Sequence, residues 1–295
     1  SVLSPEEIRK GSVAEITNRE THVNGKPAIG GLFDPRMGVL DPGLICPTDG
    51  LDYMQTPGYF GHIELARPLF YIQYLSTIIK IARCICIKCS KLLISKKKYE
   101  HLLKMSAEDR WSSVFISANK VKRCGEDTDD GCGCKQPTKI KKEGISTLTA
   151  EWDNVDGVGS DSEKMIMTLT PEILLKCFRR ISDDDVTFMG FSPIWSRPDW
   201  MICQVLAIPP PAVRPSVKHD SQQRSEDDIT HIIVSILKAN KTLQEKIQAN
   251  AATNVINDWT VLLQYYVASL IDNKIPGAPP MSQRSGRPLK AIKER

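Results

Sequence analysis

Apolar residues recur at helical spacing in three segments of the first half of the chain. The predicted helices begin at Ser4-Pro5, cover 69–82, and run from a cap at Ser106 to about Asn119. Ser4 and Ser106 suit these positions because a serine hydroxyl can accept a hydrogen bond from a backbone N–H of the first turn. The third helix places three apolar side chains on one face: Trp111, Val114 and Phe115. Residues 20–62 are rich in glycine and proline and predict loops.

The second half of the chain mixes strand and helix patterns. Weak alternation over 145–169 predicts a strand pair with a polar turn at 153–162, and 202–208 predict a further strand. Further helices are predicted to follow Thr170, Ser182, a capping-box pattern formed by Ser225 and Asp228, and a start near Val255. Short elements joined by long segments favour an irregular, mainly helical α+β fold with short strands.

Composition is that of an ordinary globular protein, and charge adds little by itself. The 295 residues are 41% hydrophobic and 25% charged, which is enough to build a core. No apolar run approaches the ~20 residues of a membrane span. The net charge of +4 is too small to indicate nucleic-acid binding. The basic residues cluster, however, in four segments: 88–98, 120–123, 139–142 and 284–295.

The cysteines carry the strongest chemical signal. There are nine, bunched and odd in number, which favours a reducing compartment over a disulfide framework. Cys86 and Cys89 form a Cys-x2-Cys turn, and Cys124 and Cys132 follow in a glycine-rich loop. Four thiolates in such a pattern are typical of one structural zinc ion. Cys134 is an alternative fourth ligand, and the competing interpretation is a set of buried free cysteines.

The other cysteines give weaker signals. Cys84 would point away from the Cys-x2-Cys turn if it lay on an extended strand. Two cysteines lie in apolar stretches and are predicted to be core: Cys177 and Cys203. Cys46, Asp49 and His62 could form a metal site or a metal-dependent hydrolase, but an ordinary loop cysteine fits the same spacing. The chain shows no phosphate loop and no dinucleotide fingerprint.

Seven short motifs follow one another along the chain. They are Ile29-Gly-Gly-Leu-Phe-Asp-Pro-Arg-Met-Gly38, Pro57-Gly-Tyr-Phe-Gly-His62 with its continuation to Pro68, and the segments 86–93, 196–201, 209–216, 226–230 and 285–290. Together they resemble the N-terminal region of the largest subunit of multisubunit DNA-dependent RNA polymerases, of the eukaryotic RNA polymerase II type. The resemblance covers essentially the whole chain.

The resemblance implies a fold and a role. The region would form the clamp, a mobile jaw that closes over DNA and the RNA–DNA hybrid and is stiffened by zinc. Residues 209–216 would lie in a dock region where initiation factors act, 218–226 would form the lid loop, and 283–290 the rudder. Four basic residues are expected to neutralise phosphates without reading sequence: Arg224, Arg284, Arg287 and Lys290. The expected partners are the DNA template, the hybrid, and the second-largest and smaller polymerase subunits, with no membrane.

Two departures from the family pattern matter. The family's first zinc site uses Cys-x2-Cys-x6-Cys-Pro-Gly-His, and the corresponding residues here are Cys46, Asp49, Thr56 and Tyr59. We therefore expect no zinc there, and the loss suggests a divergent lineage such as a large DNA virus. The magnesium-binding aspartates of the catalytic segment are absent and would lie beyond Arg295. The parent enzyme, a nucleotidyltransferase that makes RNA from NTPs, would bind Mg²⁺ outside this piece of a longer protein.

This interpretation divides the chain into three segments. They are 1–70 with the degenerate first zinc site, 71–180 as a zinc-bearing clamp head, and 181–295 with the dock-like, lid and rudder segments. The runner-up is a free-standing zinc-binding adaptor for nucleic acid or protein. The expected location is the nucleus, or a cytoplasmic virus factory or virion if the source is viral.

Overall fold

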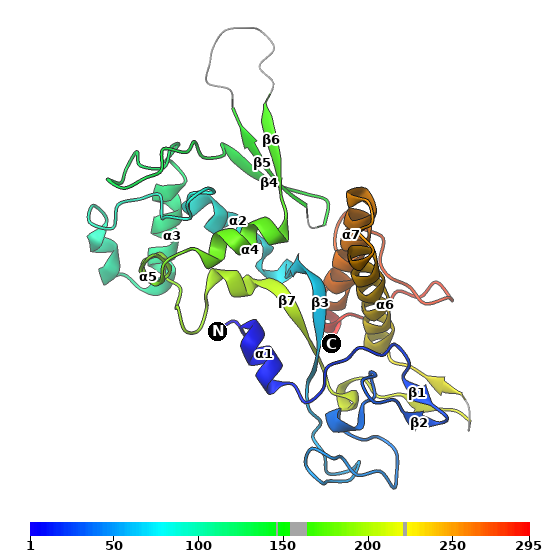
Figure 1. The fold of residues 1–295 in the computed structure, drawn as a ribbon. Helices are drawn as coiled ribbons and strands as arrows, with labels where there is room; N and C mark the ends of the chain where they lie inside the picture. The colour runs from blue at the N-terminus through cyan, green and yellow to red at the C-terminus, as the bar shows by residue number, and fades with distance from the viewer. Residues whose placement is uncertain (146, 154–163, 221–222) are drawn as a thin grey trace. The chain divides into compact units, whose positions relative to one another are not determined.

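The computed structural model describes residues 1–145, 147–153, 164–220 and 223–295 (Figure 1). The α-helices of these residues are α1 Pro5–Gly11, α2 Leu75–Cys84, α3 Ala107–Ala118, α4 Pro171–Arg179, α5 Asp183–Met189, α6 Asp228–Gln248 and α7 Thr253–Ile271. The strands are β1 His22–Val23, β2 Lys26–Pro27, β3 Gly61–Phe70, β4 Lys139–Glu143, β5 Thr147–Trp152, β6 Met165–Leu169, β7 Ile202–Ile208, β8 Val217–Lys218 and β9 Arg224–Ser225. This inventory confirms the predicted irregular α+β fold.

The chain divides into two compact units. Unit 1 contains residues 1–3 and 68–202, and unit 2 contains residues 4–67 and 203–295. The divisions fall within β3 and close to the start of β7, and these two strands pair with each other. Among the described residues, no helix combines the length and apolar character needed to cross a bilayer.

Unit 1 is built around a three-stranded antiparallel sheet in the order β4-β5-β6. Its core is a cluster of buried side chains drawn from the sheet and from the helices α2 to α5, including Ile140, Leu148, Ala150 and Leu169. The ring of Trp111 on α3 packs edge-on against Phe191 at 4.8 Å between centroids. The aromatic face predicted for this helix is therefore a packing face.

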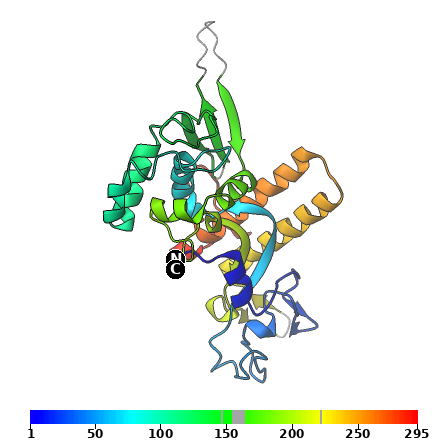
Figure 2. The same cartoon turned by 60° about the vertical axis from the view of Figure 1, so that its left-hand side comes forward.

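Unit 2 contains the longest helices, α6 and α7, which lie side by side as an antiparallel pair (Figures 1 and 2). The buried apolar face of α6 includes Ile229, Ile232, Ile233, Ile236, Leu237 and Leu243. A buried asparagine fixes α6 to β3: Asn240 accepts from the backbone N–H of Ala66 at 2.8 Å and donates to the carbonyl of Glu64 at 2.9 Å. A helix that would otherwise rest on apolar contacts thereby gains a specific register.

Three predicted local features are wrong. The helix predicted over 69–82 begins only at Leu75, because the apolar residues up to Phe70 belong to β3. The capping box at Ser225 does not form: Ser225 lies in β9, and Asp227 caps α6 by accepting from the N–H of Ile229 at 2.9 Å. Cys84 is the last residue of α2 and not part of an extended strand.

The predicted strand pair is part of a larger sheet. The sequence missed β4 because only Ile140 of its five residues is buried, so no apolar alternation marks it. The turn predicted at 153–162 lies, apart from Asp153, outside the described residues. The predicted helices after Ser106, Thr170 and Ser182 are confirmed as α3, α4 and α5, each capped by the hydroxyl of that residue.

Candidate metal centre and nucleic-acid interface

The four cysteines chosen from spacing converge in unit 1. The Sγ atoms of Cys86, Cys89, Cys124 and Cys132 all lie within 4.8 Å of one another. Two of these pairs are Cys86 with Cys132 at 3.6 Å and Cys89 with Cys124 at 3.7 Å. A tetrahedron of thiolates at ~2.3 Å from zinc has edges of about 3.8 Å, so the residues fit this ion.

The first two of these thiols belong to residues 85–92, here called the Cys86 knuckle. The N–H of Cys86 donates to the carbonyl of Lys91 at 2.8 Å, and the N–H of Ser90 donates to the carbonyl of Cys86 at 2.8 Å. Ser90 has a positive φ of 64°, unusual outside glycine, and its buried hydroxyl lies 3.3 Å from the thiol of Cys177. This tight turn presents Cys86 and Cys89 on the same side.

The other two thiols belong to a loop that is closed by backbone contacts. The N–H of Cys124 donates to the carbonyl of Cys134 at 2.9 Å, and the N–H of Gly133 donates to the carbonyl of Cys124 at 3.0 Å. A Cβ on Gly131 would lie 2.1 Å from the Cα of Gly125, so only glycine allows the two sides of this loop to meet here. The loop brings Cys132 into the cluster and leaves Cys134 outside it, with its thiol 3.5 Å from the carbonyl of Lys135.

Hydrogen bonds favour the thiolate form of Cys86. Burial opposes ionisation, but the N–H groups of Cys89 and Lys88 and the side chain of Gln136 outweigh it and lower the pKa of Cys86 to about 7. The amide Nε2 of Gln136 lies 3.3 Å from this sulfur. Burial raises the pKa of Cys124 to about 12. Since a metal ligand must be deprotonated, bound zinc would supply the charge that Cys124 needs to ionise.

Ion pairs connect the two ligand-bearing segments. Lys91 pairs with Asp130 at 3.1 Å and Lys98 with Asp127 at 2.6 Å, and the N–H of Ser95 donates to Asp127 at 3.0 Å. Each pair joins the basic run at 88–98 to the acidic run at 126–130. Two of the five lysines of this basic cluster, Lys91 and Lys98, are therefore paired with acidic residues beside the candidate metal centre.

The remaining cysteines of the apolar stretches are core residues, as predicted. Cys177 and Cys203 are buried, and the thiol of Cys177 lies against the carbonyls of Cys86 and Ile87. Cys84 is fully buried, and this burial raises the pKa of its thiol to about 12. All three are inert packing groups and do not belong to the four thiols of the candidate metal centre.

A second turn in unit 2, residues 45–52, has the same backbone and is here called the Cys46 knuckle. The N–H of Cys46 donates to the carbonyl of Leu51 at 2.9 Å, and the N–H of Gly50 donates to the carbonyl of Cys46 at 2.8 Å. Antiparallel bridges close both turns, Ile45 with Asp52 here and Ile85 with Leu92 in the Cys86 knuckle. Gly50 corresponds to Ser90 in the other turn and also has a positive φ, of 73°.

The residue equivalent to Cys89 in the Cys46 knuckle is Asp49. Its carboxylate accepts from the hydroxyl of Thr56 at 2.8 Å, the hydroxyl of Tyr59 at 3.0 Å and the N–H of Leu51 at 2.9 Å. Burial opposes ionisation, but these hydrogen bonds outweigh it and lower the pKa of Asp49. His62 does not join them: its ring contacts the hydroxyl of Ser12 at 2.6 Å and Glu64 at 3.5 Å. The set of Cys46, Asp49 and His62 is thus not assembled.

The four basic residues expected to contact nucleic acid fall into two classes, all in unit 2. Arg224 pairs with Asp41 at 2.7 Å, and Arg287 pairs with Asp228 at 2.8 Å. Arg284 and Lys290 are exposed and form no ion pair among the described residues. Arg224 is the first residue of β9 and lies opposite Lys218 of β8 in their short antiparallel hairpin.

The proline-rich segment is held in place by a buried arginine. Arg214 is fully buried and donates to the carbonyls of Leu32 and Pro209, at 2.5 and 3.0 Å. Burial lowers its pKa to about 10, and its guanidinium lies 5.2 Å from the ring centroid of Phe33. These contacts give residues 209–216 a fixed conformation.

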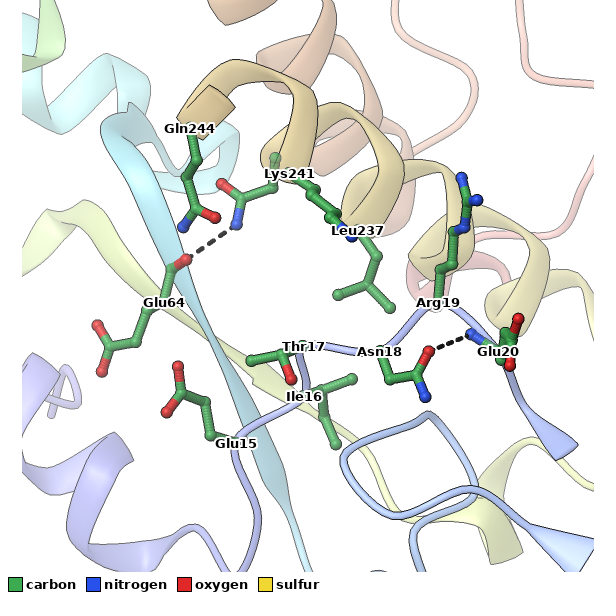
Figure 3. Close-up of a pocket in the computed structure, with 11 residues that line it drawn as sticks. Glu15, Ile16, Thr17, Asn18, Arg19, Glu20, Glu64, Leu237, Lys241 and Gln244 are labelled. Atoms are coloured by element: carbon green, nitrogen blue, oxygen red, sulfur yellow. Dashed lines mark hydrogen bonds between the residues drawn. The ribbon is translucent and has the colours of Figure 1, made fainter. Parts of the chain in front are cut away.

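An open cavity of about 590 Å³ in unit 2 offers no comparable chemistry (Figure 3). It lies between residues 15–20, β3 and α6, and its charged lining mixes three glutamates with Arg19 and Lys241. One of them, Glu64, is already paired with Arg9 at 2.7 Å. Among the described residues, the thiol cluster is the one group with metal-ligand geometry.

Comparison with known proteins agrees with the motif order. The family described as RNA polymerase Rpb1, domain 1, matches residues 1–295. The chain is 40% identical over 305 residues to the DNA-directed RNA polymerase subunit Rpo1N of Methanocaldococcus jannaschii, covering 100% of this chain and 22% of that protein. The chain thus spans about a fifth of the length of this relative. It belongs to the RNA polymerase Rpb1 domain 1 family.

Proposed function

We propose that this chain forms the clamp of the largest subunit of a DNA-dependent RNA polymerase and holds DNA and the RNA–DNA hybrid during transcription. The observation that carries the proposal is the match of the domain 1 family to all 295 residues. The parent enzyme would join NTPs on a DNA template, with its magnesium-binding aspartates elsewhere in the subunit. We propose further that the polymerase is of the eukaryotic RNA polymerase II type and that its source is viral.

In this role the metal centre is structural. Cys86, Cys89, Cys124 and Cys132 would hold one zinc ion, which crosslinks two segments that are also joined by ion pairs. No position is left open for substrate when four thiolates surround the ion. The zinc would therefore stiffen unit 1 rather than take part in nucleotidyl transfer.

Contacts to nucleic acid would be made by basic side chains that bind phosphates. A polymerase must move over every sequence, so its grip cannot depend on base edges. The exposed side chains of Arg284 and Lys290 suit this requirement. The second-largest and smaller subunits, and initiation factors at the proline-rich segment, would be the protein partners.

An elongation assay tests the proposal. Polymerase containing the full-length subunit is assembled on a DNA–RNA scaffold, and the half-life of the complex is measured as salt is raised. The double variant Arg284→Ala/Lys290→Ala should shorten the half-life at moderate salt, because two phosphate contacts are lost. The control Lys238→Ala, an exposed lysine on α6, should not. An unchanged half-life in the double variant would contradict the proposed grip.

A further inference from the structure

Residues 281–290 form a closed turn, here called the terminal hairpin. Gln283 donates to the carbonyl of Arg287 and Leu289 to that of Met281, both at 2.9 Å, and Ser282 bridges Pro288. This segment carries three of the four cations expected to contact nucleic acid. How it is held decides which of them can do so.

The base of the terminal hairpin is held by Asn273, just after α7. Its side-chain amide donates to the carbonyls of Met281 at 2.9 Å and Leu289 at 2.8 Å, and its oxygen accepts from the N–H of Met281 at 2.8 Å. Asn273 is 4% exposed. A buried side chain that uses three hydrogen bonds on one hairpin fixes its position strongly.

Asp228, in the first turn of α6, contacts the terminal hairpin at three further positions. Its carboxylate accepts from the side chains of Gln283 at 3.0 Å and Arg287 at 2.8 Å, and from the N–H of Lys290 at 3.0 Å. Asp228 is 7% exposed, and the amino end of a 21-residue helix favours its negative charge. The carboxylate cannot leave this position without losing three partners.

We propose that Asp228 is a positioning residue that neutralises Arg287, so that Arg284 and Lys290 are the phosphate-binding cations of the terminal hairpin. The neighbouring cations support this division, because Lys293 pairs with Asp272 at 2.8 Å and Arg295 with Asp227 at 2.6 Å. The ion pair with Asp228 then compensates the charge of Arg287, while Asn273 and the other two contacts of Asp228 hold the hairpin without it. This inference rests on the proposed function.

Salt dependence separates the two classes of cation. In assembled polymerase on a DNA–RNA scaffold, Arg284→Ala and Lys290→Ala should each reduce the slope of log K against log salt by about 1. Arg287→Ala should leave the slope unchanged. A loss of about 1 in the Arg287 variant would overturn the assignment, whereas unchanged slopes for Arg284 and Lys290 would instead contradict the proposed grip on nucleic acid.

Hydrogen exchange tests the positioning role without nucleic acid. Asp228→Asn in the full-length subunit should make the amides of Gln283 and Leu289 exchange about tenfold faster, the effect of losing about one charged hydrogen bond. The matched control Asp272→Asn, which removes the charge paired with Lys293, should leave these amides unchanged. Equal protection in both variants would overturn the role of Asp228.

A second, independent observation concerns the Cys46 knuckle. Its backbone is that of the Cys86 knuckle, but Asp49 stands where the second thiol would be. Thr56 and Tyr59 both donate to this carboxylate from the far side of the loop. We infer that the Asp49 carboxylate, bonded to Thr56 and Tyr59, closes this loop in place of a metal ion.

Replacement of the hydrogen-bonded residues by thiols provides the test. The triple variant Asp49→Cys/Thr56→Cys/Tyr59→Cys, together with Cys46, should raise the zinc content of the full-length subunit by one ion per chain. Without the three cysteine replacements, the single substitution Asp49→Asn should speed amide exchange over 46–59, whereas the single substitution Asp52→Asn in the same loop should not. A metal in the unaltered protein that is lost on Cys46→Ala would overturn the inference, as would equal exchange in the two single variants.

Discussion

The Cys46 knuckle and the Cys86 knuckle have the same backbone and different closures. Each has the same two backbone hydrogen bonds, the same antiparallel bridge and one residue with positive φ. Beyond the turn, the Cys86 knuckle faces two thiols from a distant loop, and the Cys46 knuckle faces a threonine and a tyrosine hydroxyl. The comparison separates the conformation of a knuckle from the ion usually associated with it.

The chemistry of closure differs because the central group differs. A zinc ion is an acceptor of electron pairs and requires four deprotonated or neutral donors around it. A carboxylate is itself the negative centre and requires hydrogen-bond donors, which Thr56, Tyr59 and the N–H of Leu51 supply. Where Asp49 stands in place of the second cysteine, the thiols that face the Cys86 knuckle are thus replaced by hydrogen-bond donors.

The largest expected effect is the loss of the Cys86 knuckle's thiols. Cys86→Ser/Cys89→Ser should abolish zinc binding and unfold the lobe around residues 84–134. Structural zinc contributes about 10–16 kcal/mol in small zinc domains, as much as the whole stability of a typical domain. Zinc content and circular dichroism measure the result. Cys46→Ser is the control, and a loss of zinc in that variant would break the distinction between the two knuckles.

The next effect separates the two candidate fourth ligands. Cys132→Ser should lower zinc affinity by several orders of magnitude, whereas Cys134→Ser should change stability by less than about 1 kcal/mol. The reason is that Cys132 joins the group of thiols within 4.8 Å and Cys134 does not. Competition with a chromogenic chelator measures both variants. The opposite ranking would exchange their roles.

A smaller effect is expected from the neighbour of Cys86. Gln136→Glu keeps the shape of the side chain but removes the N–H that lies 3.3 Å from the Cys86 sulfur. Loss of such a supporting hydrogen bond typically costs 10–100-fold in metal affinity, roughly 1.4–2.8 kcal/mol. The same chelator competition is the measurement, and Gln55→Glu in unit 2 is the control. An affinity unchanged by Gln136→Glu would show that the amide is not part of the site.

The smallest effect is a difference in acid sensitivity. Because its pKa is lowered in the folded chain, Asp49 stabilises the Cys46 knuckle fully above its ordinary pKa of about 3.9 and loses this contribution as pH falls further. Protons compete with zinc for thiolates at higher pH. As pH is lowered, the amides of the Cys86 knuckle should therefore lose their protection from exchange at a higher pH than those of the Cys46 knuckle. Simultaneous opening would mean that the two closures share one chemistry.

Much of the metal centre could be predicted from the sequence, because ligand spacing is a local property. Cys86 and Cys89 lie on one turn, and any structure that keeps the turn keeps them together. The fourth ligand could not be decided, since Cys132 and Cys134 flank the same glycine. The structure places the thiol of Cys132, and not that of Cys134, among the other three, and the loop that does so is closed by the tertiary contact of Gly125 with Gly131.

Pairing of charges was the least predictable feature. Arg224, Arg287 and the lysines of 88–98 all look available in the sequence. Asp41 and Asp228 pair with the two arginines, however, and the 126–130 run pairs with two of the five lysines. Their partners lie between 29 and 183 residues away. The Cys46 knuckle did leave a signal: Asp49 and Gly50 stand at the same spacing from Cys46 as Cys89 and Ser90 from Cys86.

The most direct test of the account is amide hydrogen exchange of both knuckles in the full-length subunit, with and without a strong zinc chelator. The account predicts that residues 85–92 lose their protection when the metal is removed, while residues 45–52 keep theirs. Loss of protection in both knuckles, or in the Cys46 knuckle alone, would contradict it.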